Sequence, residues 1–169
     1  LQNVSTHCYL LESAQANEAW GRYTFLGYDP KLEINCIDGH MKLGKLSVET
    51  ENPSEYIRQI LSEYKSPKFD YLSSFTGGLV GYFSYDYLGY KEKSIRGKAR
   101  DTEDFKDVDL MLFDKVIAFD NLCQKIILIA NMSLDAPETG YNKAIVELKQ
   151  LRELLMHGEK KQNMGGKLL

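Results

Sequence analysis

Two nearly continuous apolar segments, residues 110–119 and 125–130, limit the fold of this chain more than any other feature. The polar residues Asp120 and Asn121 separate them, which predicts two strands joined by a turn. Strands in which apolar and polar side chains scarcely alternate are covered on both faces. The pair is therefore expected at the centre of a sheet, with protein packed on each side.

The first third of the chain predicts an antiparallel meander. Short β-prone runs occupy residues 7–11, 22–26, 32–37 and 41–43. Asp38-Gly39 between the last two favours a type I′ hairpin, because both residues tolerate positive φ. A glycine-rich strand is expected over residues 77–83, whereas the polar residues 88–107 predict a long surface loop.

Two amphipathic helices are expected. Asn52 and Glu55 are spaced as a capping box and Pro53 suits a first turn, so a helix is predicted to begin there and to close before Pro67. A second helix is expected from about Asp135. The resulting order, β-β-β-α-β-β-β-α with hairpin links, predicts an α+β fold with antiparallel sheet. Residues 1–157 are assigned to one domain, and residues 158–169 to a linker or disordered tail.

Composition excludes several classes of function. The chain has 169 residues and a net charge of -3, which argues against a nucleic-acid partner. Three widely spaced cysteines predict no disulfide framework and favour a cytoplasmic protein. No apolar run has membrane length and no signal peptide is evident. Because the chain begins at Leu1 rather than Met, we expect a trimmed or excised piece.

No catalytic or metal-binding constellation emerges from the residue pattern. The three histidines, His7, His40 and His157, lack the spacing of a metal site. Ser13 lacks the nucleophile elbow of hydrolases, and Cys8 sits in an apolar run where thiols are usually inert. The glycines of residues 77–81 are not followed by the Lys of a phosphate-binding loop. We interpret them as allowing another backbone or side chain to approach closely. Residues 101–109 predict a solvated acidic loop.

Four segments carry a resemblance to a known family. They are Leu10-Leu11-Glu12-Ser13, residues 21–27 with Asp29-Pro30, residues 77–86, and Ala118-Phe119-Asp120-Asn121. In this order they resemble the N-terminal region of component I of anthranilate synthase, and of its relative aminodeoxychorismate synthase component I. The resemblance implies the N-terminal half of that fold, with sandwich-like antiparallel sheets and helices packed outside.

The resemblance also implies a function for the longer protein. The family converts chorismate to anthranilate, with ammonia supplied by a glutamine amidotransferase subunit (component II) and Mg²⁺ bound at the chorismate site. Its catalytic and metal residues belong to a C-terminal chorismate-binding domain, so this chain is expected to hold no catalytic residue, metal or cofactor. The N-terminal region packs on that domain and carries part of the tryptophan feedback site, which falls here on Leu11, Glu12 and Ser13.

The chemistry of this segment is compatible with an amino-acid effector. Glu12 can pair with the ammonium of tryptophan, while the Ser13 hydroxyl and backbone N–H groups can bind its carboxylate. Leu11 and neighbouring strand residues can provide the apolar contacts that the indole needs. The alternative is that Glu12 and Ser13 only end a strand and begin a loop. Arg22 is interpreted as structural, fixing a loop through a carboxylate or carbonyls, and Tyr82, Tyr85 and Tyr87 are expected at the seam with the catalytic domain.

Three other functions remain open at this point. The same domain of aminodeoxychorismate synthase would serve folate synthesis, and a bound tryptophan would be structural there. A free-standing amino-acid-binding module would lack an attached enzyme. An independent hydrolase would use Ser13 or Cys8 as its nucleophile.

Overall fold

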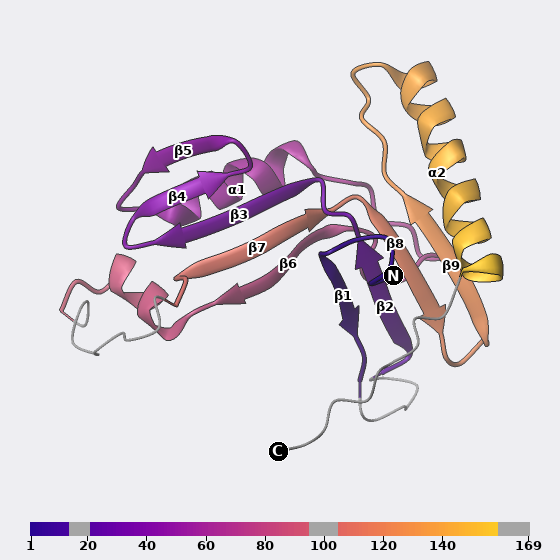
Figure 1. The fold of residues 1–169 in the computed structure, drawn as a ribbon, viewed down its shortest axis with the longest axis horizontal. Coiled ribbons are helices and arrows are strands. Elements are labelled where there is room, and N and C mark those ends of the chain that lie inside the picture. The colour runs from indigo at the N-terminus through magenta and orange to yellow at the C-terminus, as the bar shows by residue number, and fades with distance from the viewer. Residues whose placement is uncertain (14–20, 95–104, 159–169) are drawn as a thin grey trace.

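The computed structural model describes residues 1–13, 21–94 and 105–158. Within them the chain forms two antiparallel β-sheets and two α-helices (Figure 1), which confirms the predicted α+β class with antiparallel sheet. The two sheets lie side by side about a bend in the chain. Sandwich-like packing stays a prediction. None of the helices within these ranges is long and apolar enough to span a bilayer.

The four-stranded sheet has the order β1-β2-β8-β9. Its strands are β1 (Cys8–Leu11), β2 (Tyr23–Tyr28), β8 (Lys115–Asp120) and β9 (Lys125–Ala130). The helix α2 (Pro137–His157) packs against β9 and buries Ala144 and Leu151.

The five-stranded sheet has the order β5-β4-β3-β7-β6. Its strands are β3 (Leu32–Ile37), β4 (His40–Leu43), β5 (Leu46–Glu49), β6 (Gly78–Phe83) and β7 (Val108–Phe113). The helix α1 (Pro53–Glu63) covers one face, where its Ile57 and Ile60 join a buried cluster with Ile34 and Leu110. A 3-10 helix, η1 (Tyr85–Tyr90), follows β6.

The predicted hairpin at Asp38-Gly39 is confirmed. Their φ angles of 48° and 82° are the left-handed values that a type I′ turn needs, and β3 and β4 pair in register on either side of it. The strand β5 was not expected, because its short run is mostly exposed and lacks an apolar face strong enough to stand out.

The capping box predicted before α1 does not form. Asn52 is the N-cap residue, but its side chain makes no cap hydrogen bond. Its Oδ1 instead accepts a hydrogen bond of 2.7 Å from the Ser54 hydroxyl. The first turn therefore relies on Pro53 at its start rather than on a side-chain cap.

The predicted single strand over residues 110–119 is wrong. The chain bends at Asp114, so that β7 belongs to the five-stranded sheet and β8 to the four-stranded sheet. Both halves are largely buried, as the apolar run indicated, but each contributes to a different sheet. Asp114 and Lys115 are the polar interruption in the run that marks this bend.

Asn131 ties the two sheets together at the bend. Its side-chain Nδ2 donates hydrogen bonds to the backbone oxygens of Thr76, at 2.7 Å, and of Asp114, at 3.0 Å. Its backbone N–H also donates to the Asp114 oxygen at 2.8 Å. One carboxamide thus joins the end of β9, the β7–β8 bend and the entry to β6. A Cβ on Gly77 would lie 2.8 Å from Nδ2, so glycine is needed beside it.

The glycines of residues 77–81 allow close approach, as interpreted from the sequence. Gly81 has a φ of 152°, and a Cβ there would collide with the backbone carbonyl of Asp109 on β7. A side chain at this position would force the β6–β7 pair apart.

The expectation of a solvated acidic loop is wrong for Asp107. This carboxylate is buried, and it accepts hydrogen bonds from the Tyr90 hydroxyl at 2.7 Å and the Asp38 N–H at 2.9 Å. The pKa of Tyr90 is raised, first by burial and then by its hydrogen bonds to Cys36 and Asp107. Residues 88–90, also predicted to be loop, belong to the 3-10 helix η1. Residues 95–104, with the other acidic side chains up to 104, lie outside the described residues.

We expect Asn131→Ala to destabilise the chain by about 2 kcal/mol, because two hydrogen bonds are lost: the Thr76 oxygen loses this donor, and the Asp114 oxygen keeps only the Asn131 backbone N–H. Urea denaturation monitored by circular dichroism measures the change. Asn121→Ala is the matched control, since the Asn121 side chain bonds only at the exposed surface. Equal stability losses in the two variants would contradict the clamping role of Asn131.

Candidate functional site

The predicted effector residues lie together at one end of the edge strand β1. Leu11 is the last residue of β1, and Glu12 and Ser13 follow it directly. All three are exposed, Leu11 to 44%. Within the described ranges, no strand pairs with the outer side of β1. The segment is therefore accessible to a ligand or to another part of a protein.

An apolar face continues from Leu11 into the neighbouring strand. Leu11 is paired with Phe25 of β2, so both side chains lie on the same face of the sheet. Tyr23, two residues before Phe25, shares that face, and the two rings stack with centroids 5.9 Å apart. Phe75 covers Phe25 edge-on at 5.6 Å. An aliphatic and aromatic surface thus lies beside Glu12 and Ser13. Of the residues that form it, only Leu11 was predicted by name from the sequence.

Tyr9 fixes the middle of β1. Its ring lies directly on Gly27 of β2, where a Cβ would collide with it. The ring also meets Phe113 edge-on at 4.7 Å, and Phe113 belongs to the other sheet. Burial raises the pKa of the Tyr9 hydroxyl well above its usual range. The strand that carries Leu11 is therefore paired within its own sheet and packed against the other.

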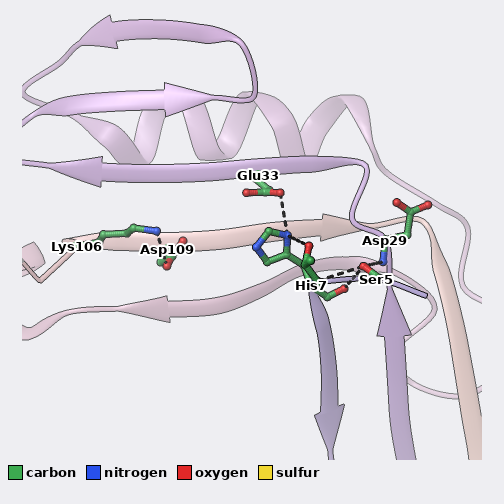
Figure 2. A network of polar contacts seen from close by, with 7 residues as sticks. Ser5, His7, Asp29, Glu33, Lys106 and Asp109 are labelled. Atoms are coloured by element: carbon green, nitrogen blue, oxygen red, sulfur yellow. Dashed lines mark hydrogen bonds and ion pairs between the residues drawn. The ribbon is translucent and has the colours of Figure 1, made fainter. Parts of the chain in front are cut away.

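Polar contacts hold the residues that precede β1, and Figure 2 shows them. The Ser5 hydroxyl accepts hydrogen bonds from the backbone N–H groups of His7 and Asp29, each at 3.1 Å. The His7 ring Nδ1 lies 3.1 Å from a carboxylate oxygen of Glu33 on β3. The start of β1 is thereby joined to β3 as well as to the loop after β2.

Arg22 has the structural role predicted for it. Its guanidinium binds the Asp120 carboxylate through two hydrogen bonds, Nε to Oδ1 at 3.1 Å and Nη2 to Oδ2 at 2.8 Å. Asp120 is 1% exposed and also accepts from the backbone N–H groups of Leu122 and Cys123. These bonds join the start of β2 to the turn after β8. The guanidinium also lies over the Tyr23 ring, 4.9 Å from its centroid.

The Arg22–Asp120 pair determines the charge state of its carboxyl group. The hydrogen bond from Arg22, followed by that from the Cys123 N–H, holds the pKa of Asp120 far below its usual value. The same pair raises the pKa of Arg22. Both groups stay charged at neutral pH, so this contact is a fixed support for β2 and for the aromatic face beside Leu11.

A cavity lies away from the predicted effector residues. It has a volume of about 910 Å³, opens beside the β7–β8 bend, and has Lys31, Tyr64, Phe69, Asp114 and Leu134 among its lining residues. Leu11, Glu12 and Ser13 are not among them. Among the residues whose positions are described, no group of three His, Cys, Asp or Glu side chains could hold a metal ion.

Comparisons with known proteins give one consistent result. Anthranilate synthase component 1 of Pseudomonas aeruginosa is 36% identical over 155 residues, which are 87% of this chain and 31% of that protein. The Saccharomyces cerevisiae protein of the same name is 33% identical over 139 residues, 80% of this chain and 26% of its own. The chain therefore spans between about a quarter and a third of the length of these relatives. No protein-family profile matches it.

A solved structure shares the fold. The crystal structure of anthranilate synthase component I from Streptococcus pneumoniae superimposes with a TM-score of 0.62 and 22% sequence identity. The match covers 83% of this chain and 32% of the other. Two independent comparisons, of sequence and of fold, thus lead to proteins of one name and to a similar fraction of their length.

The depressed pKa of Asp120 predicts a specific loss of stability in acid. Its carboxylate stabilises the fold fully above its unfolded pKa near 3.8, and that contribution disappears as the pH falls from there toward the lower folded pKa. We expect Asp120→Asn to be less stable than the parent at pH 7 and to lose less stability between about pH 4 and pH 2. Urea denaturation at a series of pH values measures this. Parallel pH profiles for the two proteins would contradict the assignment.

Proposed function

This chain belongs to the anthranilate synthase component 1 family, and we propose that it forms the N-terminal, non-catalytic part of such an enzyme and contributes Leu11, Glu12 and Ser13 to a tryptophan feedback site. The observation that supports the site is the arrangement at the end of β1. A carboxylate and a hydroxyl lie exposed beside an apolar face that Leu11 shares with Phe25 and Tyr23.

Tryptophan presents three groups that this arrangement matches. Its indole would pack on the Leu11 and Phe25 side chains, where aromatic contact adds to the burial of apolar surface. Its ammonium would pair with the Glu12 carboxylate, and its carboxylate would accept from the Ser13 hydroxyl and nearby backbone N–H groups. Because the site lies open at a sheet edge, residues from elsewhere in the longer protein would complete its walls.

Feedback control follows if the completed site has two arrangements. Tryptophan can inhibit only if it binds one domain arrangement more tightly than the other. The strand β1 is suited to transmit such a preference, because Tyr9 and His7 connect it to both sheets. In this proposal, tryptophan stabilises the arrangement in which chorismate turnover is disfavoured.

The chemistry itself belongs to the rest of the enzyme in this proposal. Chorismate, the Mg²⁺ at its site and the ammonia delivered by a component II amidotransferase would meet in a chorismate-binding domain outside this chain. The relatives reported above are all named anthranilate synthase, which favours this enzyme over aminodeoxychorismate synthase. We infer that this chain alone has no synthase activity, and that the complete enzyme acts in the cytoplasm.

We expect Glu12→Gln and Ser13→Ala in the full-length enzyme to raise the tryptophan concentration for half-inhibition by about 10-fold or more, since each removes a hydrogen bond to a charged group worth about 1.5–3 kcal/mol. Anthranilate fluorescence measures the rate across a tryptophan titration. Activity without tryptophan should stay within about twofold, because neither residue is expected to touch chorismate.

Glu49→Gln and Ser47→Ala are matched controls, because both residues are exposed on β5 of the other sheet. They should leave inhibition unchanged. Normal inhibition in both Glu12→Gln and Ser13→Ala would remove the segment from the feedback site.

A further inference from the structure

The cavity beside the β7–β8 bend has no part in the proposed tryptophan site. Its volume of about 910 Å³ lies in the range of about 300–1,000 Å³ that is usual for small-ligand sites. It is lined by the end of α1, by the ends of β7 and β9, and by the segment that leads into α2 (Figure 1). A ligand bound there would contact both sheets at their junction.

Apolar side chains around this cavity are left in contact with water. Tyr64, the C-cap residue of α1, and Phe69 are both exposed, and Leu134, shortly before α2, is 77% exposed. The Phe69 ring is held in place by stacking on the Tyr71 ring, with centroids 5.3 Å apart. A flat apolar group against these side chains would remove their surface from water, and an aromatic group would add ring contacts.

The Lys31 ammonium is well placed to hold an acid group beside these rings. Its Nζ lies 5.2 Å from the centroid of the Tyr64 ring and 3.5 Å from a carboxylate oxygen of Asp114. The second distance is longer than an ordinary hydrogen bond, so the donors of the ammonium stay available. The Lys31 backbone N–H donates to the Leu112 oxygen at 2.8 Å, which fixes this residue at the junction of the sheets. A ligand carboxylate can therefore bind Lys31 while its apolar part packs on Tyr64.

Asp114 calls for a hydrogen-bond donor on the same ligand. Its carboxylate is 19% exposed, and no described residue donates a hydrogen bond to it, Lys31 at 3.5 Å being its ion-pair partner. A largely buried acceptor gains free energy when a donor reaches it. The charged lining residues carry both signs: Lys31, Lys65, Glu63, Asp114 and Asp135. This set disfavours a ligand with several charges of one sign and favours one with both an acid group and an amino donor.

We propose that this cavity binds a small aromatic acid that carries an amino group. The ring packs against Tyr64 and Phe69, the carboxylate binds Lys31, and the amino group donates to Asp114. Aminobenzoates and aromatic amino acids share this chemistry. The inference goes beyond the proposed function, because the cavity and the end of β1 have no residue in common. A ligand that binds the folded chain at the junction would also stabilise the relative placement of the two sheets.

Methyl NMR of the full-length enzyme tests the site, with anthranilate and phenylalanine as separate probes. We expect the methyl signals of Leu72 and Leu134, which line the cavity, to shift saturably with at least one of them. Saturation by anthranilate alone would identify an aminobenzoate as the ligand, and saturation by phenylalanine alone an amino acid. No saturable shift of these signals with either compound up to about 10 mM would overturn the proposal.

Analogues that lack the carboxylate test the contact with Lys31. Aniline corresponds to anthranilate, and phenethylamine corresponds to phenylalanine. We expect each to have a dissociation constant at least about tenfold higher than its acid, because a hydrogen bond between two charged groups is lost. Equal affinity of acid and analogue would overturn the proposal.

Two variants, each with a matched control, add a second readout. Lys31→Gln should raise the dissociation constant of the bound acid at least about tenfold, whereas Lys42→Gln should leave it unchanged, because Lys42 is an exposed lysine of β4 that does not line the cavity. Phe69→Ala should also weaken binding, and Leu46→Ala, at an exposed apolar position of β5, should not. Equal effects of both variants and their controls would overturn the proposal.

The same preparation separates this inference from the proposed function. Anthranilate production from chorismate, with inhibition by tryptophan, tests the proposed function without reference to the cavity. An active, inhibitable enzyme whose Leu72 and Leu134 signals do not respond would refute only the cavity ligand. Saturable binding in the cavity of an enzyme that tryptophan does not inhibit would refute only the proposed feedback site.

Discussion

The carboxamide of Asn131 holds together the part of the fold on which the rest depends. The chain leaves one sheet at Phe113 and enters the other at Lys115, close to where it also passes from β2 to β3. A buried backbone oxygen left without a donor costs about 1–3 kcal/mol. The Asn131 side chain, just after β9, donates to the Thr76 oxygen before β6 and gives the Asp114 oxygen a second donor beside the Asn131 backbone N–H. The relative placement of the sheets follows from this junction.

The candidate feedback site depends on that placement through β1. Tyr9 reaches across to Phe113 beside the bend, and His7 reaches Glu33 on β3, so an edge strand of one sheet is fixed against the other. The ion pair between Arg22 and Asp120 holds the start of β2, the strand beside β1, to the end of β8. What these supports leave exposed is the end of β1, where a carboxylate, a hydroxyl and an apolar face come together. Rigid support beneath an open, polar strand end is suited to binding a small zwitterion.

Much of this fold could be predicted from periodicity and turn chemistry, since β3, the Asp38-Gly39 turn and the two helices follow from local pattern. The bend at Asp114 could not be predicted. An apolar run has the same sequence pattern whether its residues form one strand or two strands in different sheets. The burial of Asp107 was missed for a related reason: its partners Tyr90 and Asp38 are distant in sequence. Phe25 and Tyr23 escaped prediction as site residues because only strand register places them beside Leu11.

In the proposed function, the end of β1 binds tryptophan in the complete enzyme, beside the chorismate-binding domain. A crystal structure of the full-length protein grown with tryptophan tests it most directly. We predict an indole against Leu11 and Phe25, with the ammonium and carboxylate within hydrogen-bond distance of Glu12 and Ser13. Tryptophan bound only elsewhere, for example in the cavity of about 910 Å³ beside the bend, would contradict the claim.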